Sequence, residues 1–128
     1  MGEYYLHKGI RIHYSDQGRG VTVMLIHGYL ETMKVWDDFA RKLSADHRVI
    51  VVDLPGHGRS EMMAEIHTME MIAEVLKGLL ESLDIGRAFL TGHSLGGYIA
   101  LAFGELYPGM MSGYCLFHSH PMADTPEA

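Results

Sequence analysis

Gly92-His93-Ser94-Leu95-Gly96-Gly97 is the stretch that decides both the fold and the chemistry expected of this chain. An apolar run precedes it and predicts a strand, and the apolar residues that follow predict a helix. A chain that turns abruptly from strand into helix holds its turn residue in strained geometry, so glycines are needed two positions before and after it. Gly92 and Gly96 stand there. The pattern predicts that Ser94 is a nucleophile held at the edge of a sheet, the alternative being a serine that only caps the helix.

Strand and helix signals alternate from this turn to both ends of the chain, which predicts the α/β class. We expect a mostly parallel sheet of about six strands with helices on both faces. The first two strands flank Lys8-Gly9 as an antiparallel pair at the sheet edge. The predicted strands are residues 4–7, 10–14, 21–26, 49–52, 87–91 and 113–117.

Three helices are predicted between these strands. Trp36, Phe39, Ala40 and Leu43 share one apolar stripe that should pack on the sheet. The longest helix should run from about residue 68 to 83, with its acidic residues facing away. The helix after Ser94 is apolar almost all round, so we expect it to be buried.

The composition narrows the classes of function. The 128 residues carry a net charge of −6 and no basic cluster, which argues against nucleic acid as a partner. The sequence has no apolar run long enough for a membrane span and no signal-peptide pattern at its start, so no membrane association and a cytoplasmic location are expected. The single cysteine, Cys115, stands in an apolar run and is expected to be buried and inert.

His27-Gly28-Tyr29 follows the predicted strand 21–26 and is the second motif. Acyl transfer develops an oxyanion that needs preorganised N–H donors. We assign those donors to the backbone N–H groups of Tyr29 and Leu95. Gly28 lets the backbone approach closely, and His27 is expected to orient the loop rather than to exchange protons.

The third motif, residues 53–60, reads Asp-Leu-Pro-Gly-His-Gly-Arg-Ser and follows the predicted strand 49–52. It predicts a tight, rigid turn beneath the pocket. It matches neither dinucleotide-binding nor phosphate-binding glycine patterns, so no cofactor is expected.

These three motifs, in this order, resemble the α/β-hydrolase superfamily, specifically its small esterase, haloperoxidase-like and carbon–carbon-bond hydrolase branch. The resemblance extends from about Tyr4 to His118 and implies the first six strands of an eight-stranded sheet. It implies that Ser94 attacks an ester or related carbonyl substrate through an acyl-enzyme. Residues 1–118 are then expected to form the N-terminal part of the core domain, and residues 119–128 a lid connection or a disordered tail.

In such enzymes the acid follows the seventh strand and the histidine the eighth. The chain ends before either, so we expect the 128 residues alone to be nearly inactive. Asp124 could serve as acid and His118 or His120 as base, and the three together raise a metal site, although their spacing supports it poorly. His93 adjoins the nucleophile but should point away from it. Because the spacing of His118, His120 and Asp124 supports a metal site poorly, no metal is predicted.

Two alternative functions are compatible with the sequence. One is a non-catalytic ligand-binding module with this fold. The other is a half-protein completed by a second chain or a domain swap, because the edge of the strand 113–117 is expected to be open. Homo-oligomers or pairing with a C-terminal complement are therefore expected.

Overall fold

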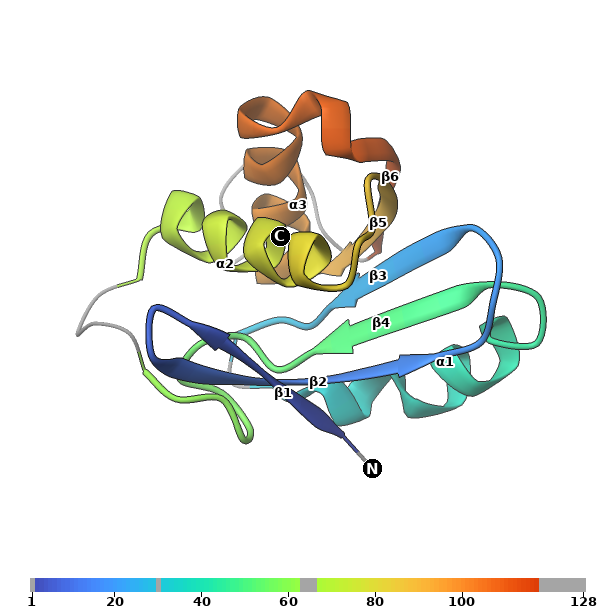
Figure 1. Ribbon diagram of the computed structural model, residues 1–128, viewed down its shortest axis with the longest axis horizontal. Coiled ribbons are helices and arrows are strands. Elements are labelled where there is room, and N and C mark those ends of the chain that lie inside the picture. The colour runs from blue at the N-terminus through green and yellow to red at the C-terminus, as the bar shows by residue number, and fades with distance from the viewer. Residues whose placement is uncertain (1, 30, 63–66, 118–128) are drawn as a thin grey trace, which may run out of the picture.

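A six-stranded sheet is the centre of the molecule, as the computed structural model shows for residues 2–29, 31–62 and 67–117 (Figure 1). Its strands lie in the order β1-β2-β4-β3-β5-β6. β4, β3, β5 and β6 are parallel, while β1 and β2 run antiparallel to their neighbours. The predicted α/β class is confirmed. The strands are β1 Glu3–His7, β2 Ile10–Gln17, β3 Thr22–Ile26, β4 Arg48–Val52, β5 Ala88–His93 and β6 Met111–Phe117.

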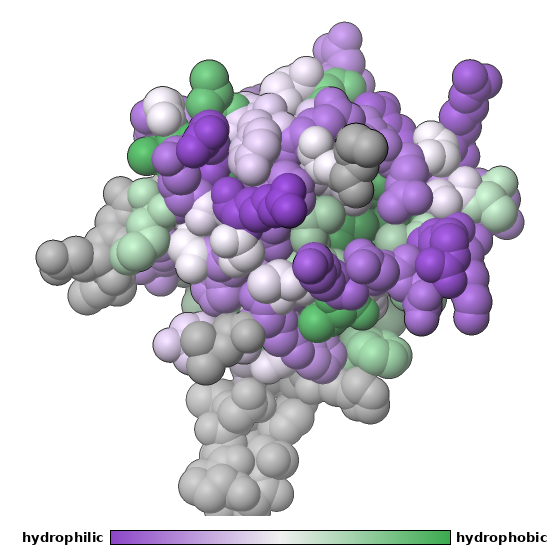
Figure 2. Space-filling view, turned by 90° about the horizontal axis from the view of Figure 1, so that it is seen from below, coloured by the Kyte–Doolittle hydropathy of each residue, from purple (hydrophilic) through white to green (hydrophobic). Residues whose placement is uncertain are grey.

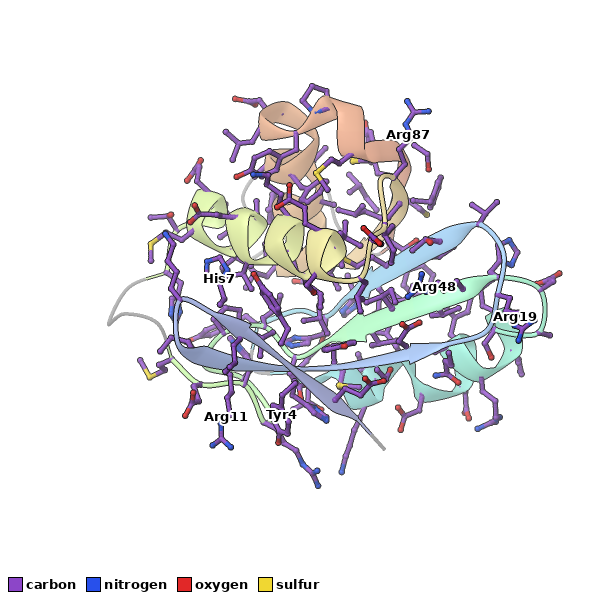
Figure 3. All side chains as sticks on the ribbon, viewed as in Figure 1. Tyr4, His7, Arg11, Arg19, Arg48 and Arg87 are labelled. Carbon is purple, nitrogen blue, oxygen red and sulfur yellow. The ribbon has the colours of Figure 1, made fainter. Side chains whose placement is uncertain are left out.

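The predicted hairpin between β1 and β2 is present, and its two turn residues have the backbone conformation that a tight turn needs. Lys8 and Gly9 both have positive φ, 49° and 85°, as a two-residue turn between twisted antiparallel strands requires. β2 is longer than predicted and pairs with β4, so β1 is an edge strand and β2 is not. The sequence pattern missed this extension because its last residues are polar. Arg48 of β4, labelled in Figure 3, donates to both carboxylate oxygens of Asp16 on β2 and secures this pairing.

Helices cover both faces of the sheet. α2 (Met69–Ser82) and α3 (Leu95–Leu106) lie on one face, and α1 (Asp37–Leu43) lies on the other (Figure 1). The side chain of Thr68 accepts a hydrogen bond from Met71 N and begins α2 close to its predicted start. Two 3₁₀ turns complete the set, η1 (Met33–Trp36) before α1 and η2 (Pro108–Met110) after α3.

The strands alternate their side chains between two separate apolar layers. On one face, Met24, Ile26 and Leu90 are fully buried beneath α2 and α3. On the other face, Leu25 and Val51 are buried beneath η1 and α1. Because β4, β3, β5 and β6 are parallel, their carboxyl ends meet at one edge of the sheet, which is where ligands bind in open α/β folds.

Two burial predictions are wrong, and they have a common cause. Phe39 of α1 is 48% exposed, and Cys115 of β6 is exposed rather than buried. β6 is the last strand of the sheet, and the described helices on the α1 side pack mainly on β3 and β4. α3 is buried along Ile99 and Phe103 as predicted, and only its last turn, which includes Leu106, is exposed. The predicted lid connection or tail at 119–128 lies outside the described residues.

Candidate active site

Ser94 occupies the sharp turn between β5 and α3. Its φ of 57° and ψ of −115° form a combination that residues with a Cβ rarely adopt. The turn closes because two glycines stand beside it. A Cβ at Gly92 would collide with the backbone of Gly96, and a Cβ at Gly96 would collide with the carbonyl oxygen of Ile26 on β3. The surrounding backbone therefore fixes Ser94 in a strained conformation.

The loop after β3 lies directly against this turn. β3 and β5 are adjacent parallel strands, and Ile26 pairs with Gly92, so both strands end at the same level. A Cβ at Gly28 would stand 3.1 Å from the Ser94 Cβ and 3.1 Å from the His93 carbonyl oxygen. These distances are tighter than almost all real Cβ contacts, so a glycine favours this close approach of the loop backbone. The structure thus brings together the two motifs to which the sequence assigned the nucleophile and the oxyanion donors.

Glu31 connects the loop to the turn, and the sequence reasoning missed it. Its Oε1 accepts a hydrogen bond from Gly28 N at 2.6 Å and another from His93 Nδ1 at 3.1 Å. The Glu31 N–H in return donates to the Gly28 carbonyl oxygen. The spacing Gly28-x-x-Glu31 resembles a capping box and was the available signal. Since the Gly28 N–H is engaged, Tyr29 supplies the next N–H of the loop.

The charge of Glu31 is favoured by these contacts. Burial alone would raise the pKa of its carboxyl group, but the hydrogen bonds from Gly28 and His93 outweigh burial and lower it. Because a carboxylate can only accept, His93 Nδ1 carries the proton of this bond. Glu31 is therefore an ionised clamp between the β3 loop and the residue before Ser94.

His27 is fully buried and uses both ring nitrogens. Leu54 N–H donates to His27 Nε2 at 3.0 Å, so this nitrogen is unprotonated, and Nδ1 donates to the Gly28 carbonyl oxygen at 2.7 Å. Burial lowers the pKa of His27. The ring is thus a neutral bridge from the β3 loop to the end of β4, which is the geometry of an orienting residue.

Asp53 organises the third motif from beneath. Its side chain is buried and accepts hydrogen bonds from Met33 N at 2.8 Å, His13 Nδ1 at 2.9 Å and Arg59 N at 3.1 Å. A Cβ at Gly58 would collide with this carboxylate. The segment 53–60 therefore ties β2, η1 and the end of β4 together. Sequence reasoning identified the turn but not its link to His13, forty residues away.

Comparison with known proteins identifies the family. A sequence model described as the alpha/beta hydrolase fold matches residues 21–128. The chain belongs to the α/β-hydrolase family.

Its α/β-hydrolase relatives include several enzymes. Over 105 residues the chain is 41% identical to a 2-hydroxy-6-oxononadienedioate/2-hydroxy-6-oxononatrienedioate hydrolase of Paraburkholderia phymatum, covering 77% of this chain and 36% of that protein. It is 35% identical to the dihydrolipoyllysine-residue acetyltransferase component of an acetoin cleaving system of Pseudomonas putida, covering 78% of this chain and 27% of that protein. A thermophilic esterase of Thermogutta terrifontis superposes with a TM-score of 0.89 at 32% identity, covering 99% of this chain and 48% of that chain. The chain thus spans about a third of the first of these proteins and half of the esterase.

This α/β-hydrolase core carries a small cavity beside the turn. The cavity has a volume of 130 Å³, and its walls include Glu31, Trp36, His93 and Phe117. Its lining combines the apolar side chains of Trp36 and Phe117 with the polar residues Glu31 and His93.

Some predicted features of the α/β-hydrolase fall outside what the structure describes. His118, His120 and Asp124 lie beyond the described residues, so the alternatives built on them remain predictions. Within residues 2–29, 31–62 and 67–117, His, Cys, Asp and Glu form no group of three or more suited to a metal ion. No helix in that part of the chain is long and apolar enough to span a membrane.

Proposed function

We propose that this chain is the nucleophile-bearing part of a serine hydrolase that acts on an ester or related carbonyl substrate. The observation that carries the proposal is the backbone of Ser94, held at φ 57° and ψ −115° between β5 and α3. Strain of this kind costs about 1–3 kcal/mol and persists where the surroundings impose it, often at active sites. A serine that merely capped a helix would have the extended backbone typical of that position.

The reaction would proceed in two steps through Ser94. Its Oγ attacks the substrate carbonyl carbon while a histidine takes the hydroxyl proton, and the carbonyl oxygen becomes an oxyanion. The oxyanion then collapses, the leaving group departs with that proton, and an acyl group remains on Ser94. Water, deprotonated by the same histidine, releases the acid. The histidine and its partner acid are expected in the part of an α/β-hydrolase that follows β6.

The oxyanion would lie between the two loops that converge on Ser94. The N–H groups of Tyr29 and Leu95 are the proposed donors, and Leu95 opens α3, whose N-terminus favours negative charge. One such donor contributes about 3 to 4 kcal/mol to the transition state in a serine protease. Glu31 and His27 would hold the first donor in place through Gly28.

The relatives support a carbonyl substrate but disagree about its class. The Paraburkholderia phymatum relative is named for a 2-hydroxy-6-oxo dienedioate, and the Thermogutta terrifontis structure is titled an esterase. A carbonyl carbon attacked by a nucleophile is common to both reactions. Esterase activity therefore stays a prediction. The cytoplasmic location stays a prediction as well.

A fluorophosphonate probe with peptide mapping tests the proposal. The protein is treated alone and after co-expression with the C-terminal part of the Paraburkholderia phymatum relative that follows the matched region. We expect an adduct on Ser94 in the assembled form, formed much more slowly by the chain alone because loss of a triad histidine costs roughly a millionfold. Ser112, exposed on β6, is the control and should stay unlabelled. Tight ligand binding without any Ser94 adduct would instead favour a binding module.

A further inference from the structure

A second cavity opens beside the start of α1, between η1 and the segment 53–60. It has a volume of 310 Å³, and among the described residues none lines both this cavity and the smaller one beside the Ser94 turn. Figure 2 shows the molecule from the α1 side, where hydrophilic side chains predominate. Small-molecule sites have volumes of about 300 Å³ or more. The cavity is therefore large enough for a small ligand of its own.

Asp53 holds the two walls of this cavity together. Its Oδ1 accepts a hydrogen bond from Met33 N at the start of η1, and its Oδ2 accepts one from Arg59 N on the opposite segment. His13 Nδ1 donates to the same Oδ2. His13 is 7% exposed and Asp53 2%, and both line the cavity. A buried and fixed polar pair thus anchors the backbone of both walls.

Three charged side chains belong to these walls. Lys34 follows Met33, so Lys34 and Arg59 both start from backbone that is bonded to one carboxylate. Asp37 N–H donates to the Lys34 carbonyl oxygen, which places Asp37 one helical turn from Lys34. Lys34, Asp37 and Arg59 are exposed and line the cavity. None of the three forms a salt bridge with another described residue.

The balance of these charges indicates the kind of ligand. The Asp53 carboxylate is already satisfied by three N–H donors, which leaves two cations and one carboxylate to be paired. An anion would pair with Lys34 and Arg59 but would be repelled by Asp37, and a cation would meet the reverse. A ligand that carries one carboxylate and one ammonium group satisfies both kinds of charge. Hydrogen bonds between ionised groups are about twice as strong as neutral ones.

We propose that this cavity binds a small free α-amino acid as a zwitterion, with its carboxylate between Lys34 and Arg59 and its ammonium group at Asp37. Met33 is a buried apolar residue of the same wall, which favours an amino acid with an aliphatic side chain. An amide at either end of the ligand removes one of the two charges, so blocked amino acids should bind weakly. The site is separate from the Ser94 turn, and the proposal does not depend on the chemistry proposed there.

Three compounds test the two charges of the ligand separately. L-leucine is the zwitterion, N-acetyl-L-leucine lacks the ammonium charge and L-leucinamide lacks the carboxylate. The isotope-labelled protein is titrated with each compound at constant ionic strength, and the shifts of its backbone amide signals are measured by NMR. We expect L-leucine to cause saturable shifts around Lys34, Gly58 and Arg59 with a Kd of about 1 mM, and both blocked compounds to bind at least about tenfold more weakly.

Two variants assign each ligand charge to its partner. Asp37→Asn should weaken the binding of L-leucine by about fivefold but not that of N-acetyl-L-leucine, whose carboxylate it no longer repels. Arg59→Gln should weaken the binding of L-leucine by a similar factor but not that of L-leucinamide. The matched controls are Asp84→Asn, in the exposed turn after α2, and Arg19→Gln, between β2 and β3 and labelled in Figure 3. Neither control should change the binding of any of the three compounds.

Three results would overturn the proposal. The first is an absence of saturable shifts with L-leucine up to about 50 mM. The second is a blocked compound that binds as tightly as L-leucine, which would indicate a site for a simple anion or cation. The third is binding of L-leucine that Asp37→Asn and Arg59→Gln both leave unchanged, or shifts that centre on Ser94 instead of Arg59.

Discussion

Replacing Ser94 by glycine should stabilise the protein relative to replacing it by alanine. Alanine keeps the Cβ that makes φ 57° with ψ −115° unfavourable, whereas glycine removes it. The strain is worth about 2 kcal/mol, within the usual 1–3. Glycine also makes the unfolded chain more flexible, which costs about 0.4–1 kcal/mol. The net expectation is that Ser94→Gly is about 1 kcal/mol more stable than Ser94→Ala.

Urea unfolding of the two variants, followed by the fluorescence of the single tryptophan, measures this difference. With a slope of about 2 kcal/mol/M, the midpoint of Ser94→Gly should lie about 0.5 M above that of Ser94→Ala. The slopes themselves should agree, since both variants expose the same surface on unfolding. Equal midpoints, or a lower midpoint for glycine, would refute the claim that the turn holds Ser94 under strain.

Three further predictions concern the residues around the turn. Glu31→Gln, which keeps an acceptor but loses the charge facing His93, should lower the unfolding free energy by about 1 kcal/mol in urea; Glu70→Gln on the exposed side of α2 should not. Because the folded-state pKa of His27 lies below its usual 6.5, the stabilisation it provides is present above pH 6.5 and declines as pH falls through the folded pKa. Urea unfolding measured between about pH 8 and about pH 5 should therefore show that the free energy of unfolding falls more steeply with decreasing pH in the wild type than in His27→Asn. Gly96→Ala should lower the free energy of unfolding by about 3 kcal/mol or prevent folding, because the added Cβ would collide with backbone atoms. A thermal melt followed by circular dichroism that is unchanged from wild type would contradict the packing described.

The sequence predicted the strands and helices well where one face of each was buried. α2 begins within a residue of its predicted start because Thr68 caps a strong apolar period. The turn at Ser94 was predictable because its glycines are required by contacts with neighbouring backbone. These features depend on short-range patterns, which a single sequence displays directly.

The features that sequence reasoning missed depend on contacts between distant segments. Glu31 reads as an ordinary loop acid until β3 and β5 bring it to His93, 62 residues later. The exposure of Cys115 and Phe39 could not be read from apolar runs, because burial there depends on what lies beside β6 and not on the residues themselves. The hydrophobic pattern predicts which face of an element is apolar, and only the folded sheet shows whether another element packs on that face.

The central claim, that Ser94 forms an acyl-enzyme once a co-expressed C-terminal complement supplies a histidine, is tested most directly by intact-mass spectrometry. The assembly with the Paraburkholderia phymatum complement is mixed with p-nitrophenyl acetate and quenched in acid during turnover. The intact mass of each polypeptide is then measured. We predict one acetyl group on this chain, mapped to Ser94 and absent from Ser94→Ala. Hydrolysis of the ester with no acetylated chain, or an acetyl group that persists in Ser94→Ala, would contradict it.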